Sequence, residues 1–166
     1  LRLDEEWCAF LARYRFLVGL SLDGPADLHD RYRRDGAGEG SWARGRRAAS
    51  LLLGAGVDTN ALVVVTDRTA GRRREIWDSL KELGLRHFQF IACVEPDPAE
   101  PPRLAPFSVS GAAYGEILCE LFDLWRADFR DGEPTVFVRW FDALLFGYVG
   151  LPVPLCTLRE TCGDNL

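Results

Sequence analysis

The sequence predicts an α/β protein in which parallel strands alternate with helices, and three observations lead to this fold class. Three short apolar runs, at 15–22, 60–65 and 87–95, have the length and β-branched content of buried strands. Segments with apolar residues at helical spacing lie between these runs and after them. The order strand, helix, strand, helix, strand is typical of βαβ units with right-handed crossovers, which produce a parallel sheet.

The first half of the chain is expected to supply two helices and two strands. Asp4 can cap a helix, and the strand 15–22 follows it and ends in the turn Asp-Gly-Pro. Glycines mark 36–40 as a loop, and Ser41 can cap the next helix, which ends in a glycine-rich turn. The second strand, 60–65, then completes the first βαβ unit.

The second half repeats the alternation and then becomes helical. A helix over 73–83, closed by a glycine, precedes the third strand. Five of the nine prolines fall within 95–106, so this segment is expected to be an irregular loop. Helices are then expected over 111–129 and 134–150, although the β-branched start of the second leaves a strand open as far as Arg139.

The composition restricts the class of protein. A chain of 166 residues with 48% hydrophobic residues suits one globular domain, and its net charge of -5 predicts no nucleic-acid partner. No run approaches the roughly 20 apolar residues that span a bilayer, and no signal peptide is visible, so no membrane partner and a cytoplasmic location are expected. The absence of methionine and the structured character of both ends indicate an internal piece of a longer protein.

Polar residues near the ends of strands are the first candidates for a site, because the loops that follow parallel strands converge there. Ser21 and Asp23 follow the first strand and either bind a ligand or form an ordinary Asp-Gly turn. Arg44 lies in the first turn of a helix, where the helix dipole slightly disfavours a positive charge. It either meets an anionic ligand or is simply exposed. The adjacent His29 and Asp30 are expected at the surface, where they point in different directions.

The five cysteines are odd in number and unevenly spaced, which argues against a secreted disulfide framework. Cys8, Cys93 and Cys119 fall in apolar patterns and are expected to be core residues. Cys156 and Cys162 lie in a non-helical segment. Two thiolates six positions apart can ligate iron or zinc, but a complete site generally needs four ligands. Spacing alone therefore leaves their role open.

Five segments, taken in order, resemble one known family: FLVGLSLDGPADLHDRYR, GEGSWARGRRAASLLLGAGVDTNALVVV, LKELGLRHFQFIACVEP, FVRWFDALLFGYVGLP and LCTLRETCG. Together they look like the middle of an anaerobic sulfatase-maturating enzyme, a radical S-adenosylmethionine protein. The resemblance implies a partial (β/α)6 barrel. Residues 1–150 would be its second half, and residues 151–166 would begin an auxiliary iron-sulfur cluster domain of the SPASM type. Cys156 and Cys162 match the first two ligands of that 4Fe-4S cluster.

The resemblance also implies a reaction. Members of the family use a 5'-deoxyadenosyl radical to oxidise a cysteine or serine of a sulfatase to formylglycine. The implied partners are the sulfatase polypeptide and an electron donor such as flavodoxin or ferredoxin. The C-x-x-x-C-x-x-C loop of the radical-generating cluster is absent from these 166 residues. We therefore expect no catalytic residue here and no activity from this piece alone. Another peptide-modifying radical enzyme with a SPASM domain, or a non-catalytic α/β ligand-binding module, remains an alternative.

Residue by residue, the resemblance assigns cofactor contacts to four positions. Ser21 and Arg44 match positions that contact S-adenosylmethionine, the arginine through the carboxylate of the cofactor. Asp23 is expected to be a neighbour in that pocket. Ile91 belongs to a strand that would lie against the adenine or the substrate.

Overall fold

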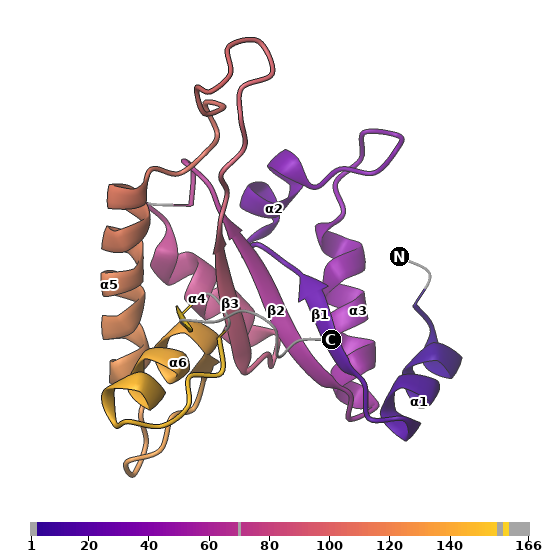
Figure 1. The fold of residues 1–166 in the computed structure, drawn as a ribbon. Coiled ribbons are helices and arrows are strands. Elements are labelled where there is room, and N and C mark those ends of the chain that lie inside the picture. The colour runs from indigo at the N-terminus through magenta and orange to yellow at the C-terminus, as the bar shows by residue number, and fades with distance from the viewer. Residues whose placement is uncertain (1–2, 70, 156–157, 160–166) are drawn as a thin grey trace.

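The computed structural model describes residues 3–69, 71–155 and 158–159. Four strands form a parallel sheet in the order β1-β2-β3-β4, with helices between and beyond them (Figure 1). The elements in chain order are α1 (Glu5–Arg13), β1 (Leu17–Ser21), α2 (Ala26–Tyr32), α3 (Trp42–Gly54), β2 (Asp58–Val65), α4 (Arg73–Glu82), β3 (His87–Ala92), α5 (Gly111–Ala127), β4 (Phe137–Val138) and α6 (Arg139–Tyr148). The predicted α/β class with parallel strands is confirmed.

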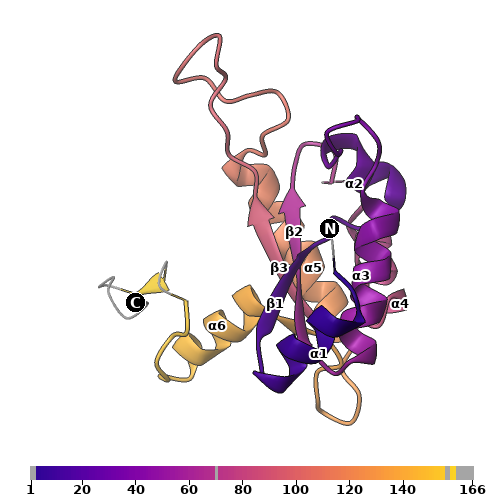
Figure 2. The same cartoon turned by 90° about the vertical axis from the view of Figure 1, so that its right-hand side faces the viewer.

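The strand order follows the chain order, which distinguishes this sheet from a doubly wound one. Each strand pairs in parallel with the next, and Ser21, Leu62 and Gln89 lie side by side across β1, β2 and β3. Right-handed crossovers in sequential order place the connecting helices on the same face of the sheet, as they do in a barrel. Figures 1 and 2 show α3 and α4 behind the sheet and α6 in front of it.

The main core lies between the sheet and helices α4 and α5, with contributions from α2 and α6. Along β2, residues 59, 61, 63 and 65 are buried and the residues between them are half-buried, because successive side chains point to opposite faces of a strand. Trp77, Phe88 and Phe90 fill the core and are in edge-to-face contact, at centroid distances of 5.3 and 6.4 Å. The strand therefore buries one face fully, where its apolar run predicted burial on both.

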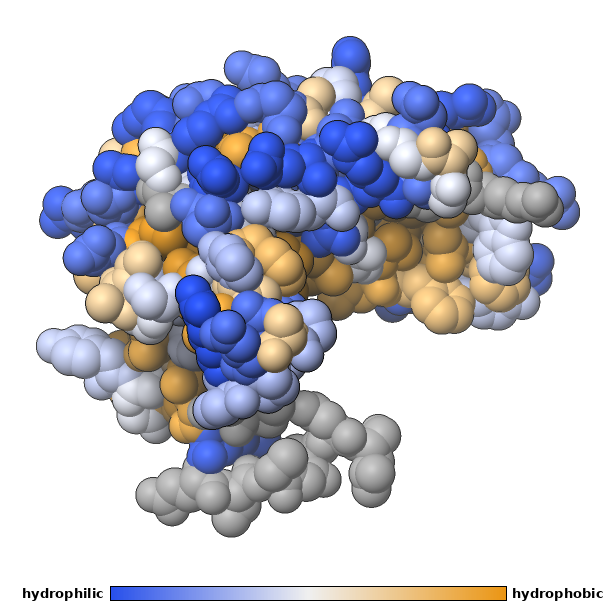
Figure 3. Space-filling model, turned by 90° about the horizontal axis from the view of Figure 1, so that it is seen from above, coloured by the Kyte–Doolittle hydropathy of each residue, from blue (hydrophilic) through white to orange (hydrophobic). Residues whose placement is uncertain are grey.

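The face of the sheet opposite the core helices carries exposed apolar side chains. Leu17 is 70% exposed on β1, Ile91 is 38% exposed on β3 and Phe137 is 41% exposed on β4. Figure 3, seen from above, shows hydrophobic residues along the hollowed side of the molecule and hydrophilic residues gathered on the opposite side. A half-barrel would present its interior in this way.

Two predicted boundaries are refined by the structure. The segment expected as a helix over 134–150 begins with β4, and α6 starts only at Arg139, so the strand alternative is confirmed for two residues. The proline-rich segment 95–106 contains no helix or strand and projects beyond the carboxyl ends of β2 and β3 (Figures 1 and 2). Within the described residues, no helix is long and apolar enough to cross a membrane.

Candidate functional site

The carboxyl ends of β1, β2 and β3 meet at one edge of the sheet, where a pocket of about 340 Å³ lies. Loops that follow neighbouring parallel strands contribute to the same rim, because those strands end on the same side. Its lining residues come from all three loops and from α2: Asp23, Tyr32, Arg33, Val64, Thr66, Cys93 and Phe107. Of the four positions predicted to contact a cofactor, Asp23 is among these lining residues, whereas Ser21, Arg44 and Ile91 are not.

Ser21 and Ile91 lie on the same face of the sheet, opposite the core helices. Ser21 is the last residue of β1 and is exposed, whereas the preceding Leu20 is buried against the helices. Ile91 pairs in register with Val64, two positions beyond the Leu62 that pairs with Ser21. A hydroxyl group and an apolar side chain are thus presented from strands on either side of β2, toward the hollowed face.

Asp23 lies in the wall of the pocket, and its carboxylate is already engaged by the protein. The residue is 7% exposed. Its Oδ1 accepts a hydrogen bond from the backbone N–H of Val64 at 2.8 Å and one from Nη2 of Arg33 at 3.1 Å, and Oδ2 accepts from Nε of Arg33. This bidentate pair fastens the turn after β1 to the end of α2 and to β2. The Asp-Gly turn after β1 therefore also forms part of the pocket wall.

Arg44 lies in the first turn of α3 and pairs with an acid from the preceding loop. Its Nη2 lies 3.0 Å from Oδ2 of Asp35, and its side chain is 42% exposed. Backbone N–H groups of Glu39 and Ala37, with a smaller contribution from Arg44, hold the pKa of Asp35 below its ordinary value. The guanidinium is thus oriented by a carboxylate and is accessible to solvent.

The prediction that His29 lies at the surface is wrong. Its side chain is 2% exposed, since α2 packs against α3 and encloses it. Nδ1 accepts a hydrogen bond from the backbone N–H of Asp23 at 3.2 Å, and Nε2 lies 2.9 Å from Oγ of Ser41. Burial lowers the pKa of His29 below its ordinary value. Adjacency to Asp30 gave no indication of this, because the partners of His29 come from distant segments.

Capping of α3 also differs from the prediction. Ser41 occupies the N-cap position, but its hydroxyl donates to the carbonyl of Arg33 at 2.8 Å and does not cap the helix. Oδ1 of Asp30 instead accepts the N–H of Trp42 at 2.8 Å. An acid from α2 therefore satisfies a free donor at the start of α3.

The cysteines divide into three groups. Cys8 is buried beside Leu52 and Val57, so its predicted core position is confirmed. Cys93 is only half-buried and lines the pocket, and Cys119 is exposed on α5, so a core position was a wrong prediction for both. Burial, with negative charges nearby, raises the pKa of the Cys93 thiol.

Cys156 and Cys162, the predicted cluster ligands, lie outside the described residues. Among the residues that are described, no three His, Cys, Asp or Glu side chains gather as metal ligands would.

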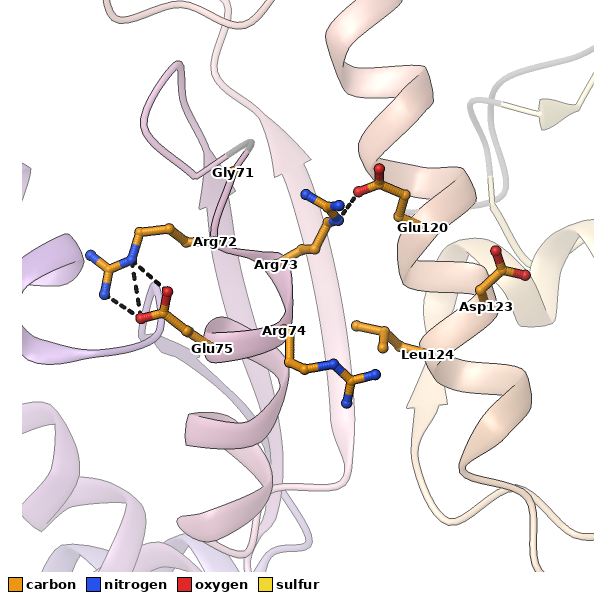
Figure 4. Close-up of a pocket in the computed structure, with 8 residues that line it drawn as sticks. All are labelled: Gly71, Arg72, Arg73, Arg74, Glu75, Glu120, Asp123 and Leu124. Atoms are coloured by element: carbon orange, nitrogen blue, oxygen red, sulfur yellow. Dashed lines mark hydrogen bonds and ion pairs between the residues drawn. The ribbon is translucent and has the colours of Figure 1, made fainter.

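A second pocket, of about 380 Å³, lies between the start of α4 and α5 (Figure 4). Arg72 pairs there with Glu75 and, outside the picture, with Asp27, and Arg73 pairs with Glu120. These ion pairs balance the charges of Arg72 and Arg73 with carboxylates. The basic cluster that begins α4 is thus a partly solvated group of ion pairs, and it offers no excess of positive charge for an anion.

The strand order and the position of the pocket together define the class of protein. Sequential parallel strands, the connecting helices α3 and α4 on one face and polar side chains at the carboxyl ends of the strands are consistent with part of a TIM-like barrel, whose ligands bind at that end.

Comparison with known proteins narrows this class. No family model matches the chain. A cysteine-type anaerobic sulfatase-maturating enzyme of Clostridium perfringens is 37% identical over 96% of this chain and 43% of its own length. A serine-type anaerobic sulfatase-maturating enzyme of Bacteroides thetaiotaomicron is 32% identical over 97% of this chain and 41% of its own length.

The solved structures agree. One of them, described as native anSMEcpe with bound AdoMet and Cp18Cys peptide, is 36% identical and matches with a TM-score of 0.87 over 96% of this chain and 44% of that chain. By sequence and by structure, the chain is related over nearly its whole length to the anaerobic sulfatase-maturating enzymes. It spans less than half the length of these relatives.

Proposed function

We propose that the protein binds S-adenosylmethionine and takes part in the maturation of sulfatases, by oxidising a cysteine or serine of the sulfatase to formylglycine. One observation carries the proposal: 96% of the chain superposes, with a TM-score of 0.87, on a relative with bound AdoMet and a peptide. The pocket at the carboxyl ends of β1 to β3 supports it, because ligands of barrel proteins bind at that end.

Side chains near the carboxyl ends of the strands and at the start of α3 suit the proposed cofactor. The exposed hydroxyl of Ser21 can donate to or accept from a polar group of S-adenosylmethionine, and Ile91 offers an exposed apolar surface to the flat adenine ring. Arg44 is paired with a carboxylate in this structure, so its guanidinium suits the carboxylate of the cofactor. Asp23 takes part through the wall of the pocket, by holding Arg33.

S-adenosylmethionine, together with a 4Fe-4S cluster, would supply the radical chemistry when bound. This chain would bind and orient the cofactor and exclude water from the reacting atoms. In the same proposal, residues 1–150 belong to the barrel and residues 151–166 begin the auxiliary cluster domain. Cys156 and Cys162 then supply two ligands of an auxiliary 4Fe-4S cluster.

The proposed substrate is a sulfatase polypeptide, and the proposed electron donor is a flavodoxin or a ferredoxin in the cytoplasm. Relatives of both types support the choice of substrate, since the chain is 37% identical to a cysteine-type enzyme and 32% identical to a serine-type one. Separate assays with a cysteine peptide and a serine peptide distinguish the two types.

A turnover assay tests the proposal. The protein as encoded, with any sequence that flanks these 166 residues, is purified without oxygen and its clusters are reconstituted. It is then incubated with S-adenosylmethionine, a reductant and a peptide that carries the target residue of a sulfatase. We expect 5'-deoxyadenosine, and a peptide aldehyde that reacts with a hydrazide. Release of 5'-deoxyadenosine without aldehyde on either peptide would indicate a different radical reaction.

The cluster assignment has its own test. Replacement of Cys156 or Cys162 by serine should lower the iron content and the visible absorption of the reconstituted protein. Cys119→Ser, at an exposed position on α5, is the matched control and should change neither. Equal iron content in all three variants would show that the assignment is wrong.

A further inference from the structure

A single hydrogen-bonded network joins the two segments that carry Ser21 and Arg44. The first segment is the turn after β1, which contains Asp23, and the second is the start of α3, which begins after Ser41. His29 of α2 lies between them and contacts both, through the backbone N–H of Asp23 and the hydroxyl of Ser41. Two positions separate Ser21 from Asp23, and about one helical turn separates Ser41 from Arg44.

The geometry defines the protonation state of the imidazole. Nδ1 must carry a lone pair, because the backbone N–H of Asp23 can only donate. The ring proton is then on Nε2, which donates to Oγ of Ser41, and the Ser41 hydroxyl donates onward to the carbonyl of Arg33. Each donor in this chain meets an acceptor when His29 is neutral, with its proton on Nε2.

Contacts on either side of His29 clamp α2 to the same two segments. Asp30 accepts the N–H of Trp42 at 2.8 Å, and the indole Nε1 of Trp42 donates to the carbonyl of Gly24 at 2.9 Å. Gly40 packs directly on the carboxylate of Asp30, where a Cβ atom would collide with it. The turn after β1, α2 and the start of α3 therefore form one connected unit.

We propose that His29 is a positioning residue of the S-adenosylmethionine pocket, whose neutral imidazole sets the start of α3, and with it Arg44, relative to the turn that follows Ser21. The inference rests on the proposed function. A link of this kind favours binding because the two contacts with the cofactor are ordered before it arrives. Without the link, only a fraction of the molecules would present both groups together, and the apparent affinity would fall by that fraction.

The charges that face His29 come from three positions: Asp23 in the turn after β1, Asp30 in α2 and Arg33 at the end of α2. The carboxylates favour a protonated imidazole, whereas Arg33 disfavours it. Burial outweighs them, and the pKa of His29 is lowered below its ordinary value. Protonation would turn Nδ1 into a donor that faces the N–H of Asp23, so the link should hold at neutral pH and open in acid.

The test measures the dissociation constant of S-adenosylmethionine, by equilibrium dialysis without oxygen, in the cluster-reconstituted protein as encoded. His29→Phe fills the volume of the imidazole but removes both hydrogen bonds, and we expect it to bind about tenfold more weakly. His29→Asn retains an acceptor near the position of Nδ1 and should recover part of the loss. Ser41→Ala removes one end of the link and should weaken binding by about threefold, which keeps the inference testable if His29→Phe does not fold.

A purely structural role is distinguished by Leu121→Ala, a change in the buried core of α5 outside the network. This variant should be less stable, yet its folded form should bind S-adenosylmethionine as the wild type does. If the wild-type protein binds S-adenosylmethionine and both His29→Phe and Ser41→Ala bind it equally well, the positioning role is overturned but the proposed function is not. If the wild-type protein does not bind S-adenosylmethionine, the proposed function fails, and the positioning role fails with it.

Discussion

The buried ion pair between Asp23 and Arg33 gives the sharpest prediction for stability. Their side chains are 10% and 27% exposed, and the carboxylate accepts two N–H groups of the guanidinium. Breaking a buried pair by removing one partner costs about 3–5 kcal/mol, because it leaves an uncompensated charge. Arg33 is partly solvated, so we expect Asp23→Asn to lower the free energy of unfolding by about 2–3 kcal/mol. Asparagine can still accept the N–H of Val64, which isolates the loss of the charge.

Urea denaturation monitored by tryptophan fluorescence measures this change, as a shift of the midpoint at constant slope. The matched control is Asp27→Asn, which removes the carboxylate from another Asp–Arg pair. Asp27 is 64% exposed and its partner Arg72 is 31% exposed, so solvent screens this pair and its loss should hardly move the midpoint. Equal midpoint shifts for Asp23→Asn and Asp27→Asn would refute the reasoning, since burial would then not decide the cost.

Three further predictions concern stability. The pKa of His29 is lower in the folded protein than its unfolded value of about 6.5, so the free energy of unfolding should fall as the pH drops below that value. His29→Asn should flatten this part of a pH series of urea titrations, and a series that the substitution leaves unchanged would contradict the prediction. Burial raises the pKa of Asp142, so its negative charge opposes folding at neutral pH. Asp142→Asn should therefore raise the melting temperature at pH 7, and a lower melting temperature would show that the charge has a partner. Gly24 has a φ of 109°, and a Cβ atom there would lie 3.2 Å from Cα of Ile76. Gly24→Ala should lower the free energy of unfolding in urea titrations by about 1–3 kcal/mol, whereas Gly36→Ala, at a position with open space, should lower it much less. Equal losses in the two variants would count against backbone strain at Gly24.

The sheet could be predicted from the sequence because buried strands and helices produce apolar runs and regularly spaced apolar residues. The apolar runs that became β2 and β3 lie against helices on one face, and the intervening helical patterns match α3 and α4. The short β4 was harder to predict, because Phe137 and Val138 are followed at once by α6 and the two patterns merge. A two-residue strand has too few side chains for its period to show.

The sequence could place candidate residues at the ends of the strands, but it could not predict the contacts around them. Ser21 as a candidate follows from the rule that parallel strands end together, whereas Ile91 is assigned only by the family resemblance. The burial of His29, by contrast, depends on how α2 packs against α3, and its partners Asp23 and Ser41 are 6 and 12 positions away. Capping of α3 by Asp30 in place of Ser41 depends on the same packing. Local patterns carry no information about such contacts.

Arg44, as the proposed ligand for the carboxylate of S-adenosylmethionine, is central to the proposed function. The decisive measurement is the dissociation constant of S-adenosylmethionine for the reconstituted wild-type protein, Arg44→Ala and Arg47→Ala, the last being an exposed arginine of the same helix. Loss of a charged hydrogen bond predicts binding weaker by about 1.5–3 kcal/mol in Arg44→Ala, and no change in Arg47→Ala. Wild-type affinity in Arg44→Ala would contradict the proposed role of Arg44.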